Sequence, residues 1–311
     1  MKYIKILLIL ICSPFVAKSQ DFPIFTTQTQ LNPSYFNPAF TGIQQNLKAG
    51  LLYRLESSGL NSSMTAITGF AELGLPKINS GFGISLRDEN VSGFQIKNSA
   101  ALSYAYELKL NSNSVLRLGA CASFYQVTLQ NIPDSINPKT GQYYVRPAES
   151  TPPILSVGTG VLYSNRNYYI GVAVNNLNQP MENLPSDPDS TYLKYVLQTG
   201  GFISMGNFVL NPYLFAQFSY QTSQILAGAN LTWKKLTIGA SFRLSNSVDE
   251  SANFLIGLNL GKFKLCYSYD QLFYVGFVPP TPIHELSLVL QLNKPHDTSS
   301  IPMIEHFRNA Y

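Results

Sequence analysis

Charge is scarce in this chain of 311 residues, in which Asp, Glu, Lys and Arg together make up 12%. Ordinary soluble domains carry about 25% charged residues, and their solubility depends on them. The chain also has no cluster of Lys and Arg of the kind that binds a phosphate backbone. Composition therefore argues against a soluble protein and against a nucleic-acid-binding protein.

Long apolar runs are missing as well. After residue 19, no run approaches the roughly 18 apolar residues that a transmembrane helix needs. A closed β-barrel remains, because only helices and closed barrels satisfy every backbone hydrogen bond in lipid. Tyr and Phe are abundant, with 19 residues each, and aromatic residues border the lipid-facing band of outer-membrane barrels.

Cysteine and histidine are rare, with three residues of each. No Gly-x-Ser-x-Gly, His-Glu-x-x-His or Cys-x-x-Cys motif occurs. His284 and Ser287 share one expected strand but lie on opposite faces, because side chains alternate along a strand. Asp187 and Asp189 provide too few oxygen ligands for calcium, which prefers six or more. We therefore expect no enzyme activity, no metal, no cofactor and no small-molecule substrate.

The start of the chain has the features of a secretory signal peptide. Lys2 and Lys5 precede an apolar run from Ile6 to Ile11, and Ala17 to Ser19 offers small residues at the cleavage spacing. We expect cleavage before Gln20. Loss of the three lysines of this segment would reduce 21 basic residues to 18, against 17 acidic ones, a net charge of +1.

Strict alternation of apolar and small polar residues predicts the architecture. One example has an apolar face of Ala252, Phe254, Ile256, Leu258 and Leu260. This period of two is typical of a barrel wall that faces lipid outside and a polar lumen inside. A soluble β-sandwich also alternates, but it would need more surface charge. We expect about 14 strands, at residues 47–56, 62–74, 82–88, 95–110, 115–129, 153–164, 168–176, 192–205, 208–220, 223–233, 236–244, 250–260, 263–270 and 283–292.

The connections between the expected strands alternate in length. Every second one is short, beginning at Asn111, Asn165, Gly206, Lys234 or Gly261. The alternate set includes the long connections 130–152, 177–191 and 271–282. Outer-membrane barrels have short periplasmic turns and longer outer loops, so we expect the long connections to face the cell exterior.

Some charged residues fall inside expected strands. These are Arg54, Arg87, Arg117 and Arg243, together with Glu107 and Glu285. Charged groups at membrane depth face the interior and pair with one another. We expect them to form salt bridges in the lumen, with a role in ion selectivity as the alternative.

The stretch NPSYFNPAFTG, residues 32–42, precedes the first expected strand. Its two prolines fix their own φ and bias the preceding asparagines toward extended conformations, so a continuous helix is excluded. We expect a stiff strap that turns the chain into the barrel at the periplasmic rim, with aromatic side chains against the lumen or the membrane interface. The alternative is an ordinary turn segment whose aromatics cap the barrel. The residues that define the motif are Asn32, Pro33, Asn37, Pro38 and Gly42.

This opening resembles the NP-x-x-x-NPA-aromatic-x-G start of the PorP/SprF family of type IX secretion system membrane proteins. Three further stretches resemble that family in the same order, and they cover nearly the whole expected mature chain. They are Gly158 to Pro180, Lys235 to Arg243, and Cys266 to Asp270 followed by His284 to Leu292.

The resemblance implies an outer-membrane barrel of the type IX secretion and gliding machinery of Bacteroidetes-like cells. Its partners would be translocon components and a secreted adhesin, whose secretion or surface anchoring the barrel supports. Leu177, Asn178, Gln179 and Pro180, at the start of an outer loop, are the candidate partner-binding residues. The alternative is a passive porin or a hydrophobic-solute channel. An open lumen would conduct ions across a planar bilayer, whereas a plugged one would not.

The expected organisation has four parts. Residues 1–19 are the signal peptide, 20–46 a periplasmic lead-in strap, 47–292 the outer-membrane barrel and 293–311 a C-terminal tail.

Overall fold

The computed structural model describes residues 25–44, 46–58, 62–91, 93–130, 132–136, 143–183, 189–220, 222–246, 250–273 and 282–292. The expected signal peptide and the tail 293–311 lie outside these residues. Within the described part, no helix is long and apolar enough to cross a membrane. The helices found there are three short 3-10 turns, η1 (Pro33–Tyr35), η2 (Pro38–Phe40) and η3 (Pro76–Ile78).

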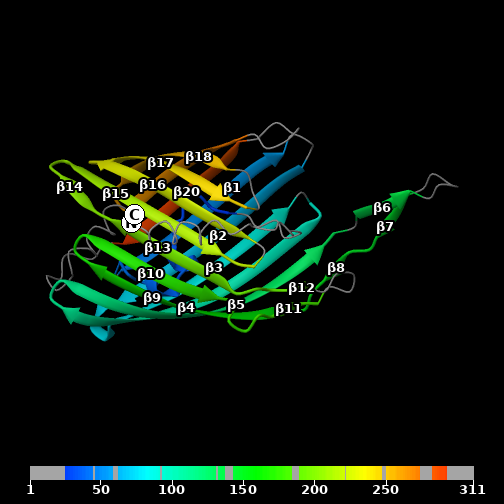
Figure 1. Cartoon of the computed structure of the whole chain (residues 1–311), viewed down its shortest axis with the longest axis horizontal. Coiled ribbons are helices and arrows are strands. Elements are labelled where there is room, and N and C mark those ends of the chain that lie inside the picture. Colours follow the sequence, from blue (N-terminus) through cyan, green and yellow to red (C-terminus); the bar gives the residue numbers. More distant parts are fainter. Residues whose placement is uncertain are drawn as a thin grey trace, which may run out of the picture.

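Long antiparallel strands of the described residues form one closed ring of 14 (Figure 1). β1 pairs with β20, and β13 pairs with β15, so the ring has no free edge. β14 continues β13 after Phe202 and pairs with the same neighbour, so the two count as one strand. The strands of the ring are β1 (Leu47–Ser58), β2 (Ser62–Leu75), β3 (Ser80–Val91), β4 (Gln95–Asn111), β5 (Ser114–Leu129), β9 (Ile154–Asn165), β10 (Tyr168–Asn175), β13 (Lys194–Gly201) with β14 (Ile203–Met205), β15 (Phe208–Phe218), β16 (Ser223–Trp233), β17 (Leu236–Ser245), β18 (Ser251–Leu260), β19 (Phe263–Leu272) and β20 (Ile283–Leu292).

The predicted barrel and its strands are thus confirmed, with small differences at strand ends. The largest difference is the interruption of the expected strand 192–205 at Phe202. The ring of Phe202 is buried, and its backbone N–H donates to the carbonyl of Asn167, in the turn just before β10. The side-chain period predicted a strand there but could not predict this local break.

Tight turns lie at one end of the ring and the long connections at the other (Figure 1). Gly206 and Gly261 have the positive φ that tight turns between strands require. At the loop end, a hairpin of β6 (Ile132–Ile136) and β7 (Tyr143–Arg146) projects away from the ring. A smaller pair, β11 (Met181–Glu182) and β12 (Asp189–Ser190), lies at the same end, and β8 (Glu149–Ser150) extends the edge of β5.

The outer wall is apolar, as the alternation predicted. On β18, Phe254, Ile256, Leu258 and Leu260 are all exposed, and β4 presents Leu102, Tyr104, Tyr106, Leu108 and Leu110 in the same way. The intervening residues point inward and, apart from Lys109 near a turn, are buried or half-buried. A lipid-facing band of this kind leaves polar groups to the interior, to the two ends and to the borders of the band.

Candidate functional site

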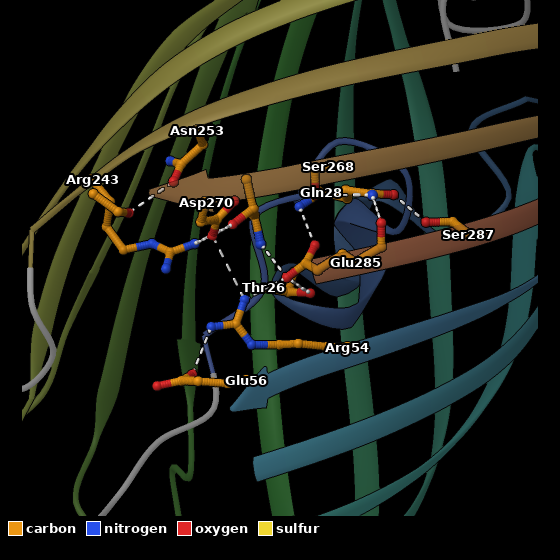
Figure 2. Close-up of polar contacts among 12 residues, drawn as sticks. Thr26, Gln28, Arg54, Glu56, Arg243, Asn253, Ser268, Asp270, Glu285 and Ser287 are labelled. Carbon is orange, nitrogen blue, oxygen red and sulfur yellow. Dashed lines mark hydrogen bonds and ion pairs between the residues drawn. The ribbon is translucent and has the colours of Figure 1, made fainter. Parts of the chain in front are cut away.

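The interior of the barrel contains the chain's own N-terminal segment, residues 25–44, which we call the plug (Figure 2). Nearly all of its side chains are buried, although it has no strand and only the two turns η1 and η2. Residues 25–44 therefore lie inside the lumen, not only at the rim where the sequence placed the strap. The two Asn-Pro pairs start the two turns, because each proline occupies the first helical position, where no N–H is needed.

Asn37 fixes the second turn to the wall. Its Oδ1 accepts a hydrogen bond from the Ala39 N–H at 3.0 Å, which caps η2. Its Nδ2 lies 3.4 Å from the carbonyl of Val161 and 3.3 Å from that of Val172, and donates to both. One side chain thus caps a turn of the plug and joins it to two neighbouring strands, β9 and β10.

Glycines on the inner wall make room for the plug. A Cβ at Gly119 would lie under 3.0 Å from backbone atoms of Pro38 and Ala39, and a Cβ at Gly81 equally close to the carbonyl of Thr41. A Cβ at Gly160 or Gly171 would likewise lie under 3.0 Å from the side chain of Asn37. We call these four residues the glycine track. Gly42, which closes the motif, has φ +65° and itself packs against Gly81, so only glycine fits its backbone without strain.

An arginine clamp holds the same turn. Arg117 on β5 donates from Nε to the Ala39 carbonyl at 2.9 Å and from Nη2 to the Thr41 carbonyl. Its Nη1 lies 2.7 Å from Glu107, the salt-bridge partner expected from the sequence. The Gly42 N–H donates to Glu72 at 3.0 Å. Buried backbone groups of the plug therefore form hydrogen bonds with charged side chains of the wall.

Two aromatic rings of the motif insert into apolar patches on the inner wall. Phe40 packs with Val115, Leu162 and Tyr169, with ring centroids of Phe40 and Tyr169 5.7 Å apart. Phe36 lies 4.7 Å from Phe215, centroid to centroid. Phe36 and Phe40 thus lie against the lumen, one of the two places expected for the motif's aromatics, and the otherwise polar inner wall is apolar where they contact it.

The first part of the plug is held by charge. The backbone N–H groups of Thr27 and Gln28 donate to the two carboxylate oxygens of Glu285, at 2.8 and 3.0 Å. The Gln28 side chain continues to Ser268 and Ser287 on β19 and β20 (Figure 2). A single carboxylate of the wall thereby accepts hydrogen bonds from two successive backbone N–H groups of the plug.

The same carboxylate belongs to a buried ion-pair cluster, which comprises Arg54, Glu56, Arg243, Asp270 and Glu285 (Figure 2). Arg54 lies 2.7 Å from Glu285, and Arg243 lies 3.2 Å from Asp270, with side chains at most 4% exposed. The hydroxyl of Thr27 bonds to both Arg243 and Asp270. The sequence predicted salt bridges of the strand arginines in the lumen. It did not predict that Asp270 and the plug residue Thr27 take part in them.

Leu177, Asn178, Gln179 and Pro180 follow β10 at the loop end, apart from the plug. The Asn178 side chain accepts from the Val157 N–H at 3.1 Å and donates to the Leu155 carbonyl at 2.7 Å. The Pro180 carbonyl accepts from Thr191 across the loop. Asn178 and Pro180 thus order the loop, while Leu177 is 44% exposed.

His284 and Ser287 do not meet. His284 faces outward and shares a 2.8 Å hydrogen bond with the Tyr267 hydroxyl, whereas Ser287 is buried against Gln28. The opposite orientation inferred from the strand period is correct.

Comparison with protein families gives one match, to the type IX secretion system membrane protein PorP/SprF, over residues 17–290. The chain belongs to this family. A PorP/SprF barrel is located in the outer membrane and is related to type IX secretion. No curated protein matches the chain.

Solved structures similar to this PorP/SprF barrel include the CymD monoaromatic hydrocarbon channel, with a TM-score of 0.57 and 11% identity over 90% of this chain and 96% of that one. The outer membrane protein Omp33 from Acinetobacter baumannii has a TM-score of 0.48 and 10% identity over 81% and 100%. At these identities the likeness concerns the fold alone.

Substitution of Gly119 by valine should displace the second turn of the plug. The larger side chain cannot fit against the backbone of Pro38 and Ala39, and overpacking of this kind costs roughly 1–3 kcal/mol. A cysteine replacing the fully buried Thr41 should then react with a maleimide in the folded barrel, with Cys121 and Cys266 replaced by alanine.

The matched control is Ala120→Val, because Ala120 is the next residue of β5 and faces outward. We expect the Thr41→Cys reporter to stay protected in this control. If the reporter were protected from maleimide equally well in the Gly119→Val variant, the glycine track would not determine the position of the plug.

Substitution of Glu285 by glutamine should destabilise the folded barrel. Arg54 and Arg243 would keep only Asp270 and Glu56 as counter-charges, and breaking a buried pair costs about 3–5 kcal/mol. The measurement is the temperature at which the folded, fast-migrating form is lost on a detergent gel. Glu89→Gln, which breaks the 2.6 Å pair with Arg87 at a site with a 21% exposed carboxylate, should lower that temperature less. An equal loss in the two variants would contradict the account.

Proposed function

We propose that this PorP/SprF barrel is a closed scaffold that supports secretion or surface anchoring of a partner adhesin by the type IX machinery. The observation that carries the proposal is the occupied lumen. The plug runs between opposite walls, from the ion-pair cluster on β17, β19, β20 and β1 to the glycine track on β3, β5, β9 and β10. A barrel filled in this way offers a partner its ends rather than its interior.

The loop end is the surface that suits a partner. It carries the projecting β6–β7 hairpin and the loop from Leu177 to Thr191 (Figure 1). Leu177 and Met181 are 44% and 55% exposed there, on a loop anchored by Asn178 and by a 3.1 Å pair between Lys97 and Glu182. Exposed apolar residues on a segment that is anchored to a rigid scaffold are typical of binding sites. In this proposal the loop end faces the cell exterior, and translocon components bind elsewhere on the barrel.

A passive channel is the alternative. CymD, which shares the fold, is named as a channel for monoaromatic hydrocarbons. The buried plug of this chain favours the scaffold, because transport through the lumen would require residues 25–44 to leave the glycine track and the ion-pair cluster. A stretch fixed at both walls by charged hydrogen bonds opposes such movement.

Replacement of residues 181–190 by a Gly/Ser linker of equal length should abolish adhesin display without unfolding the barrel. Loop changes cost little when the strands are unaltered. We expect the adhesin to be lost from the cell surface and to accumulate inside or in the medium, while other type IX cargo is secreted normally. Surface labelling and cargo immunoblots provide the measurement.

The matched control inserts the same linker between Lys234 and Lys235, in a turn at the opposite end of the barrel. Adhesin display should persist there, and a protease site in this insertion should resist cleavage in intact cells, whereas one at residue 141 should be cut. Normal display after the 181–190 exchange would remove this loop from the mechanism. Loss of all cargo would indicate a core translocon role instead.

A further inference from the structure

Gly69 on β2 differs from the other glycines of the described strands. A Cβ added there would meet nothing within 4 Å, and its φ is not positive. Glycine within a strand weakens it, because it loses more conformational entropy and packs no side chain. Among the described residues, neither backbone conformation nor packing requires glycine at this position, and the missing side chain leaves the outer surface low there.

Strand register places Gly69 in a shallow depression of about 490 Å³ on the outer wall. One row of cross-strand partners forms the floor of the depression, with one residue from each of β2, β3, β4 and β5. These residues are Gly69, Leu86, Ala100 and Phe124, and all of them face outward. Leu86 and Phe124 are 57% and 53% exposed. The small residues on β2 and β4 lower the surface on each side of Leu86.

The next outward row is polar on three of its four strands. Ile67 on β2 is apolar, whereas Asp88, Asn98 and Gln126 lie side by side on β3, β4 and β5, one step nearer the loop end. The depression therefore has an apolar floor and, along one edge, a carboxylate with apolar Ile67 on one side and the amide of Asn98 on the other. Arg87, on the next position of β3, points inward and pairs with Glu89, so it does not neutralise Asp88 on this face.

The depression lies at the border of the lipid-facing band. From Ala100 to Leu110 every outward residue of β4 is apolar or aromatic, and ten residues of a strand tilted by about 40° span roughly 25 Å, the height of such a band. Asn98 is the first polar outward residue beyond it. The floor thus lies at the depth of acyl chains and the polar row at the depth of lipid headgroups.

We propose that this depression is a binding site for a membrane lipid whose acyl chain lies over Gly69 and Ala100 and whose headgroup donates hydrogen bonds to Asp88. The carboxylate selects a headgroup with an ammonium donor and disfavours one whose only charge is anionic. The site is independent of the plug and of the adhesin loop, so it goes beyond the function proposed above.

Native mass spectrometry of the purified barrel tests the proposal, with phosphatidylethanolamine or phosphatidylglycerol added at equal concentration. The wild type should retain phosphatidylethanolamine in preference. Ala100→Phe should fill the depression and reduce retention about tenfold, since a bound chain would lose its apolar contacts. Asp88→Asn should remove the preference between the two lipids. Gly69→Leu provides a second filling variant if Ala100→Phe does not fold.

The matched control is Ala240→Phe, the same change at an exposed alanine on β17, away from the depression. It should retain lipid like the wild type. Equal retention by the wild type and the filled variants, or no preference for phosphatidylethanolamine in the wild type, would overturn the proposal. The proposal would also be overturned if the filled variants lost a co-purifying protein while their lipid retention was unchanged. That result would assign the depression to a protein partner.

Discussion

Backbone-to-backbone contact between the plug and the glycine track is the constraint on which the rest of the structure depends. Residues 37–42 approach the wall so closely that a single Cβ at Gly119 or Gly81 would collide with main-chain atoms. That approach brings the Ala39 and Thr41 carbonyls within reach of Arg117, and the ring of Phe40 into the patch around Tyr169. With residues 37–42 held at the glycine track, only a short stretch of the plug connects them to the residues that contact the cluster around Glu285.

Charged side chains of the wall bond to backbone groups of the plug at both of its ends. Glu285 accepts from the Thr27 and Gln28 N–H groups, and Arg117 donates to the Ala39 and Thr41 carbonyls, where the glycine track adds close packing. Buried ion pairs contribute little net stability but are costly to break. Among the described residues, the plug therefore has one defined position in the lumen.

The sequence predicted the wall well because a strand's two faces are visible as alternation. Ala252 to Leu260 and Ala100 to Leu110 indicated strands, faces and a lipid-facing side, and turn residues such as Gly206 and Gly261 indicated the ends. The motif's aromatic side chains were expected against the lumen or the membrane interface, but a segment that fills the lumen was not predicted. Contacts such as Asn37 with Val161 join residues far apart in the chain and leave no periodic signal. Inward glycines such as Gly119 and Gly160, at positions where strands prefer side chains, were the available signal, but sequence alone does not show what approaches them.

Hydrogen–deuterium exchange of the purified barrel tests most directly whether residues 25–44 occupy the lumen. The account predicts that peptides covering 27–42 are protected nearly as well as the strands, because the N–H groups of Thr27, Gln28, Ala39 and Gly42 have buried side-chain acceptors and such groups exchange only through local opening. Exchange of this segment at the rate of an unstructured chain, with the strands still protected, would contradict it.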